Sequence, residues 1–167
     1  MSISSEIRKA GPYACNGSNV DFPFVFKVFS SADVRVVLAD VNLIETDLTL
    51  GTHYTVALNG NQDSNPGGTV TTLSAYASGN KITLTSKLQN LQPVQLTNGG
   101  GFFPETLNDA LDRLTILVQQ VAEGLSRSVQ APLSSATTPD DLIAELLAVA
   151  AAADADAASA AAAAAAA

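Results

Sequence analysis

The chain has 167 residues, 47% of them hydrophobic, and a net charge of −8. This length suffices for one domain of about 100 residues with an extension. The charge is uneven, because residues 1–103 carry six Lys/Arg against seven Asp/Glu and residues 104–167 carry two against nine. With no basic patch to neutralise phosphates, the chain is not expected to bind nucleic acid.

No candidate catalytic residue, cofactor site or metal site stands out, and we expect a protein that is not an enzyme. The single cysteine, Cys15, excludes an internal disulfide framework and is expected to be a small buried residue. His53 alternates with strand residues and is read as structural. Asp140 and Asp141 fit helix-start charges better than an acid/base pair. Gly99–Gly101 lacks the spacing of a phosphate-binding loop.

The two ends of the chain argue against membrane insertion. The first 17 residues hold no apolar core of signal-peptide length. The final alanine run is interrupted by Asp154 and Asp156 and contains no Leu, Ile or Phe, so it is a poor membrane span. We therefore expect a soluble chain made in the cytosol.

Residues 1–103 read as short strands separated by turns, after an arm formed by residues 1–15. Phe22, Phe24 and Phe26 alternate, which places three rings on one face of a strand, and Pro23 favours an edge strand. No crossover helix fits between the strands, so we expect a small antiparallel sandwich or barrel. The expected strands lie within residues 17–29, 33–40, 46–50, 53–58, 69–73, 81–85 and 94–97.

Residues 104–129 carry the strongest pattern of the chain. Apolar residues recur there at alternating steps of four and three, which is the heptad spacing of a coiled coil. Thr106 with Asp109 is expected to cap the start of this helix. We call the apolar set the seam and expect it to be the place where copies of the chain meet; it consists of Leu107, Leu111, Leu114, Val118, Val121 and Leu125.

Two apolar residues lie off the seam, Ile116 and Leu117, and they indicate that the helix also packs sideways, onto its own β-domain or onto that of a neighbouring copy. Phe102 and Phe103 are expected to plug the β-core at its junction with the helix. An alternative stays open, in which a monomer uses one broad amphipathic face of the helix to cover its own sheet. The mixture of Leu and Val in the seam does not fix the number of helices.

The last part of the chain is a linker followed by a helix. Thr138, Pro139, Asp140 and Asp141 form a helix start, with Thr as cap and Pro at the first helical position. Fourteen of residues 151–167 are Ala, which favours helix but buries little area. Proteins rarely end in this way, so we expect either that the natural chain continues beyond Ala167 or that the alanine run stands in for undetermined residues.

Four further segments carry a pattern of their own: GSNVDFPFVF (17–26), HYTV (53–56), NPGGTVTT (65–72) and, above all, the stretch from 88 to 123. Together they resemble the N-terminal domain of tail fibres and tailspikes of short-tailed bacteriophages (podoviruses). The helix in that stretch resembles the family pattern at Leu107, Ala110, Asp112, Arg113, Gln119 or Gln120, and Glu123. The resemblance covers about residues 16–130 and is a whole-domain pattern without a catalytic signature.

The resemblance implies a homotrimer in the virion tail, docked to the tail adaptor and nozzle proteins, whose distal parts contact a host surface receptor. The predicted organisation is a β-rich tail-docking domain (1–103), a trimerisation helix (104–129), a linker (130–138) and the start of an Ala-rich helical shaft (139–167). One alternative is the anchor of a polysaccharide-degrading tailspike whose catalytic part lies beyond residue 167. Another is a free-standing adaptor or adhesin, complete at this length.

Overall fold

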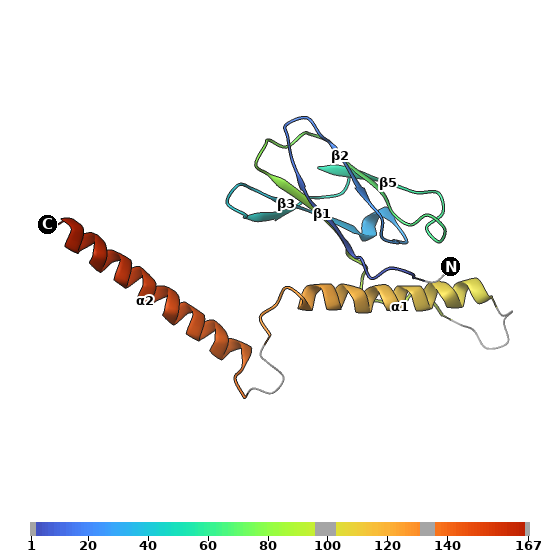
Figure 1. The fold of residues 1–167 in the computed structure, drawn as a ribbon. Coiled ribbons are helices and arrows are strands. Elements are labelled where there is room, and N and C mark those ends of the chain that lie inside the picture. Colours follow the sequence, from blue (N-terminus) through green and yellow to red (C-terminus); the bar gives the residue numbers. More distant parts are fainter. Residues whose placement is uncertain (1–2, 96–102, 131–135, 166–167) are drawn as a thin grey trace. The chain divides into compact units, whose positions relative to one another are not determined.

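The structure is a computed structural model that describes residues 3–95, 103–130 and 136–165. Residues Met1–Gly124 group into one unit and Leu125–Ala167 into a second. In the first unit, two antiparallel sheets are followed by helix α1 (Pro104–Leu125) (Figure 1). The second unit contains helix α2 (Pro139–Ala165). The expected combination of β and α structure is therefore confirmed.

The four-stranded sheet has the order β1-β7-β3-β4 and the three-stranded sheet the order β2-β6-β5. Every strand pair within them is antiparallel, as the absence of crossover helices predicted. A short 3-10 turn, Ser31–Asp33, precedes β3. The strands are β1 (Lys9–Ala14), β2 (Asp21–Phe24), β3 (Val34–Ala39), β4 (Glu45–Asp47), β5 (Tyr54–Leu58), β6 (Gly68–Thr72) and β7 (Lys81–Ser86).

The core lies between the two sheets and is built from alternating strand residues. Phe22, Phe24 and Phe26 are all buried, as their spacing predicted, although β2 already ends at Phe24. Pro23 lies in β2, which is an edge strand of its sheet, also as predicted. The other core residues are Cys15, Val28, Val34, Val36, Tyr54, Val70, Ile82 and Leu84.

Three local expectations differ from the structure. Residues 1–15 are not simply an arm, because Lys9–Ala14 pairs with β7 as strand β1, with a register shift between Ala10 and Tyr13. α1 begins at Pro104, so Thr106 lies inside the helix and Pro takes the first helical position. The strand expected at 94–97 is not formed at Val94 and Gln95, and its remaining residues lie outside the described part of the chain.

The loop between β5 and β6 folds back onto β2. Gly67 has a φ of +102°, and a Cβ at this position would collide with the backbone of Phe24 and Val25. Glycine is therefore required for this close approach. As a result Gln62 and Asp63 are hydrogen-bonded to the segment that follows β2, although Asp63 remains exposed.

Candidate functional site: the two faces of helix α1

The inward face of α1 is mostly polar. Ile116 is fully buried and Asp112 is 5% exposed, whereas Gln119, Gln120 and Glu123 are half-buried. These residues recur at the three- and four-residue steps that define one helix face. Apart from Ile116, this face contacts the β-domain through hydrogen bonds and an ion pair.

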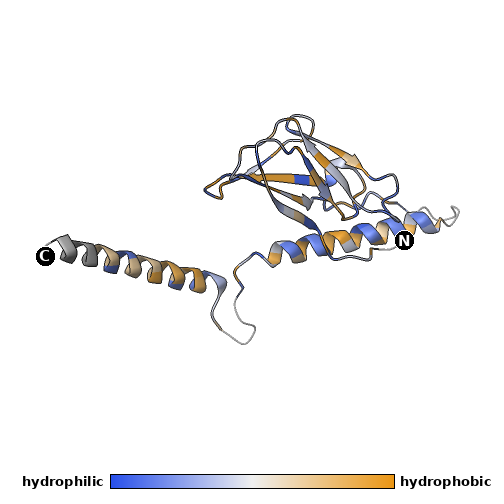
Figure 2. Ribbon diagram, turned by 45° about the horizontal axis from the view of Figure 1, so that its top comes forward, coloured by the Kyte–Doolittle hydropathy of each residue, from blue (hydrophilic) through white to orange (hydrophobic). Residues whose placement is uncertain are grey.

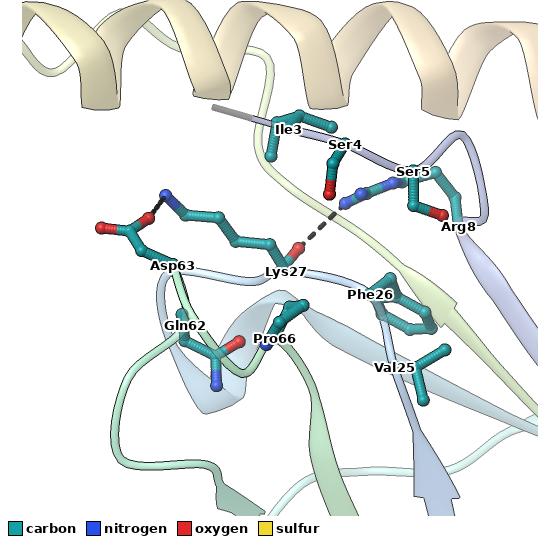
Figure 3. Close-up of a pocket in the computed structure, with 10 residues that line it drawn as sticks. All are labelled: Ile3, Ser4, Ser5, Arg8, Val25, Phe26, Lys27, Gln62, Asp63 and Pro66. Atoms are coloured by element: carbon teal, nitrogen blue, oxygen red, sulfur yellow. Dashed lines mark hydrogen bonds and ion pairs between the residues drawn. The ribbon is translucent and has the colours of Figure 1, made fainter. Parts of the chain in front are cut away.

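The centre of that contact is an anchor cluster formed by Lys27, Asp63 and Asp112 (Figure 3 shows the Lys27–Asp63 part). Lys27 Nζ donates to Asp112 Oδ2 at 2.8 Å and also to Asp63 Oδ1. Asp109 Oδ1 lies 3.9 Å from the same nitrogen, and the backbone N–H of Ile3 donates to Asp112 Oδ1 at 3.3 Å. The lysine and Asp112 are thus both buried and paired, while Asp63 stays partly exposed.

The electrostatics of the cluster follow from this pairing. Desolvation by burial lowers the pKa of Lys27, but the hydrogen bonds and charges of Asp112 and Asp63 outweigh it, so the net pKa is raised. The hydrogen bond from Lys27, together with its positive charge, lowers the pKa of Asp63. Lys27 therefore carries its charge at neutral pH and neutralises carboxylates from a loop and from α1.

The N-terminal segment contacts both the β-domain and α1. Arg8 is buried, its Nη1 donates to the carbonyl of Lys27 at 2.9 Å, and its guanidinium lies over the ring of Phe26. Gln119 Nε2 donates to the carbonyl of Ser5 at 3.1 Å. A cavity bordered by Arg8 and Lys27 has a volume of about 20 Å³ (Figure 3). That is room for about one water molecule and far below the ~300 Å³ of small-molecule sites.

A second group of contacts fixes the segment after β7 to α1. Gln120 Oε1 accepts from the backbone N–H of Leu88 at 2.7 Å and from the hydroxyl of Ser86, and its Nε2 donates to the carbonyl of Leu88 at 3.3 Å. Arg113 donates from Nε to the carbonyl of Leu91 at 2.9 Å and from Nη2 to that of Gln89 at 2.7 Å. Residues 86–91 are therefore held along the helix.

The seam lies on the outward face. Leu111, Leu114, Val118, Val121 and Leu125 are 53–61% exposed, and Leu107 is half-buried. Figure 2 shows hydrophobic positions recurring along α1 between hydrophilic ones. An amphipathic helix usually turns its apolar stripe to the core. In α1 the apolar stripe of the seam points away from the β-domain instead.

The remaining residues that the sequence singled out lie in different environments. Ile116 packs on the β-domain side and Leu117 is half-buried, whereas Phe103 is 69% exposed and does not reach the β-core. Phe102 lies outside the described residues. Cys15 is buried and its pKa is raised by desolvation. His53 Nδ1 accepts the backbone N–H of Thr49 at 3.0 Å, a turn contact.

Among the described residues, no group of three His, Cys, Asp or Glu side chains is placed to hold a metal ion. Within the same ranges, neither helix combines the length and the apolar character that crossing a bilayer requires.

The chain matches no protein-family profile. It is similar to the tail spike protein of Salmonella phage epsilon15, with 35% identity over 142 residues, which is 85% of this chain. The chain is a homologue of part of a phage tail spike. It spans only 13% of the length of that protein, so most of the tail spike has no counterpart here.

The helix pattern of the tail-spike resemblance gains a structural explanation. Asp112 pairs with Lys27, Arg113 and Gln120 hold residues 86–91, and Gln119 holds the N-terminal segment. In this chain, these four residues of the pattern therefore attach α1 to the rest of the first unit. Sequence reasoning singled out these residues through the resemblance but did not single out Lys27, which lies in an apolar run.

Proposed function

We propose that this chain is the virion-attached part of a trimeric phage tail spike or tail fibre, a structural protein of the tail that serves host attachment. In this proposal the β-domain docks to the adaptor and nozzle proteins of the tail. The seam of α1 joins three copies as a coiled coil, and α2 starts an Ala-rich shaft toward distal parts that contact the host receptor. The similarity to the epsilon15 tail spike supports the tail location.

The observation that best supports a trimer is that the seam of α1 faces away from the β-domain. Its inward face is already used by the anchor cluster and by Gln119 and Gln120. The seam itself remains exposed at heptad spacing, which suits a second and third copy of the same helix. Burying a half-exposed Leu or Val contributes about 1 kcal/mol. Several such residues per copy can offset the association cost, which is at least about 4 kcal/mol.

A second candidate is the anchor of a polysaccharide-degrading tail spike whose catalytic part lies outside this chain. The observation that favours it is that the chain spans 13% of its tail-spike relative, which leaves room for a large distal part. Both candidates share the same attachment role for residues 1–167. A sequence of the complete gene product and a degradation assay on host polysaccharide distinguish them.

The proposed function is tested with Leu114→Asp in the 167-residue chain. Each copy would then bring an unpaired charge into an apolar seam, which costs several kcal/mol. We expect the wild-type chain to be a trimer and Leu114→Asp to be a monomer, measured by light scattering after gel filtration. The matched control is Leu73→Asp, a leucine of similar exposure that directly follows β6 and is far from α1 in the sequence.

Two outcomes would contradict the proposal. If Leu114→Asp remains a trimer, the seam does not join the copies. If the Leu73→Asp control dissociates to the same extent, the effect is a general one of surface charge. Circular dichroism of both variants verifies that the β-domain stays folded.

A further inference from the structure

The segment that follows β7 presents an apolar residue directly beside α1. Arg113 holds the carbonyls of Gln89 and Leu91, and Gln120 holds Leu88, so this backbone is fixed by hydrogen bonds. The side chain of Leu91 is nevertheless 64% exposed. A leucine held rigidly at the surface costs little entropy to bury in a later contact.

Leu91 borders a surface depression of about 240 Å³ together with Ala110, Leu114 and Leu117 of α1. Leu114 belongs to the seam. Ala110 and Leu117 lie one position off it, on one edge of the seam, at the position called g when Leu111, Val118 and Leu125 are called a. The apolar surface of the seam thus continues over this edge onto the β-domain.

The opposite edge of the seam has a different character. Its residues, at the e position, are Asn108, Thr115 and Ala122, which are exposed, uncharged and short. In a parallel bundle of identical helices, the g edge of one copy faces the e edge of the next. That arrangement therefore places the g edge of one copy, with its apolar depression, against the e edge of the next copy, with its short side chains.

We propose that the depression at Leu91 receives the e edge of α1 from a neighbouring copy of this chain, with Thr115 and Ala122 as its nearest residues. The β-domain then takes part in the assembly, because Leu91 adds to the seam a contact that the helix alone does not provide. This inference rests on the proposed function, since it requires the seam to join parallel copies.

The test is a cysteine pair, Leu91→Cys with Thr115→Cys, in the 167-residue chain. Under mild oxidation we expect covalent trimers on a non-reducing gel, because residue 91 of one copy lies beside residue 115 of the next. Within one copy the two residues lie on opposite edges of the seam and cannot be joined. Cys15 is 3% exposed and does not compete. The control pair, Leu73→Cys with Thr115→Cys, should remain uncross-linked.

A second variant, Leu91→Asp, measures how much the contact at Leu91 contributes to the stability of the trimer. We expect the concentration at which the trimer dissociates to rise at least tenfold, and to stay unchanged in Leu73→Asp. A wild-type trimer that shows neither the cross-link nor this shift would overturn the inference and leave the proposed function standing. A wild-type monomer would overturn both.

Discussion

At the scale of single residues, Lys27 lies in an apolar run and yet forms the ion pair that links the β-domain to α1. β2 ends at Phe24, so the segment after it no longer alternates between two sheet faces. Lys27 is consequently 7% exposed and pairs with Asp112, 85 residues away in the sequence. A buried pair of this kind stabilises little over an apolar pair, but it is costly to break, because the remaining charge is left without its partner.

We predict that Lys27→Met destabilises the chain by about 3 kcal/mol or more, because Asp112 then stays buried without its cation. The double variant Lys27→Met with Asp112→Leu should recover most of that loss. Urea unfolding at one protein concentration measures both. Losses that simply add, with no coupling between the two sites, would show that the pair does not hold α1.

The same residue gives a prediction on pH. The pKa of Lys27 is raised in the folded chain, so its contribution is fully present below the unfolded value of about 10.4. It is lost as the pH rises through the folded pKa. The pKa of Asp63 is lowered, so its contribution is present above about 3.9 and is lost as the pH falls through the folded value.

Urea unfolding between pH 9 and 11.5 measures the loss of stability as Lys27 loses its proton. Wild type should lose more stability over this range than Lys27→Met, since the variant has no amine to titrate. Tyr54 and Tyr76 titrate in both proteins and cancel in the difference. Equal losses in the two proteins would exclude a role for Lys27.

At the scale of elements, α2 begins where its sequence predicts, at Pro139 after the cap residue Thr138. The hydroxyl of Thr138 accepts the backbone N–H of Asp141 at 3.2 Å, and the carboxylate of Asp141 accepts the N–H of Thr138 at 2.9 Å. This reciprocal pair is a capping box, with Asp at the third position. Hydrogen bonds from Thr138 also lower the pKa of the Asp141 carboxyl.

We predict that Thr138→Ala reduces the stability of the start of α2 by about 1 kcal/mol. The variant loses the two hydrogen bonds of the Thr138 hydroxyl, one from the backbone N–H of Asp141 and one to its carboxylate. The first turn should fray, which amide hydrogen exchange of residues 140–144 would detect. Thr138→Ser keeps the hydroxyl and serves as the control. Unchanged protection in Thr138→Ala would mean that the cap is unimportant for this helix.

The elements that the sequence predicts well are those whose pattern involves only residues close together in the chain. The alternation of Phe22, Phe24 and Phe26, the heptad spacing of α1 and the cap at Thr138 all depend on neighbouring residues. β1 was missed because its sequence, KAGPYA, contains Gly and Pro and shows no alternation. Its strand character comes from pairing with β7, about 70 residues away, which no local pattern encodes.

The orientation of α1 was likewise beyond sequence reasoning. The spacing of its apolar residues identifies a seam, yet it does not say whether that seam covers the sheet of the same chain. That choice depends on Lys27, Ser86 and the carbonyls of residues 88–91, which meet α1 only in the folded chain. The polar inward face leaves the seam exposed and makes the alternative of a self-covering monomer the less favoured one.

At the scale of the whole molecule, we propose that the β-domain, the outward seam and the helical extension form one attachment module of a tail spike. The tail-spike relative matches 85% of this chain, so the match includes most of these parts. Weak docking contacts of three joined β-domains on the tail would reinforce one another through effective concentration. All of this requires that the copies are joined through the seam of α1.

The most direct test of that claim is the solution mass of the 167-residue chain, compared with that of its Leu114→Asp variant, by light scattering after gel filtration. We predict three chains for the wild type, about 51 kDa from 17.1 kDa per chain, and one chain for the variant. A wild-type mass of one chain, or an unchanged trimer in the variant, would contradict it.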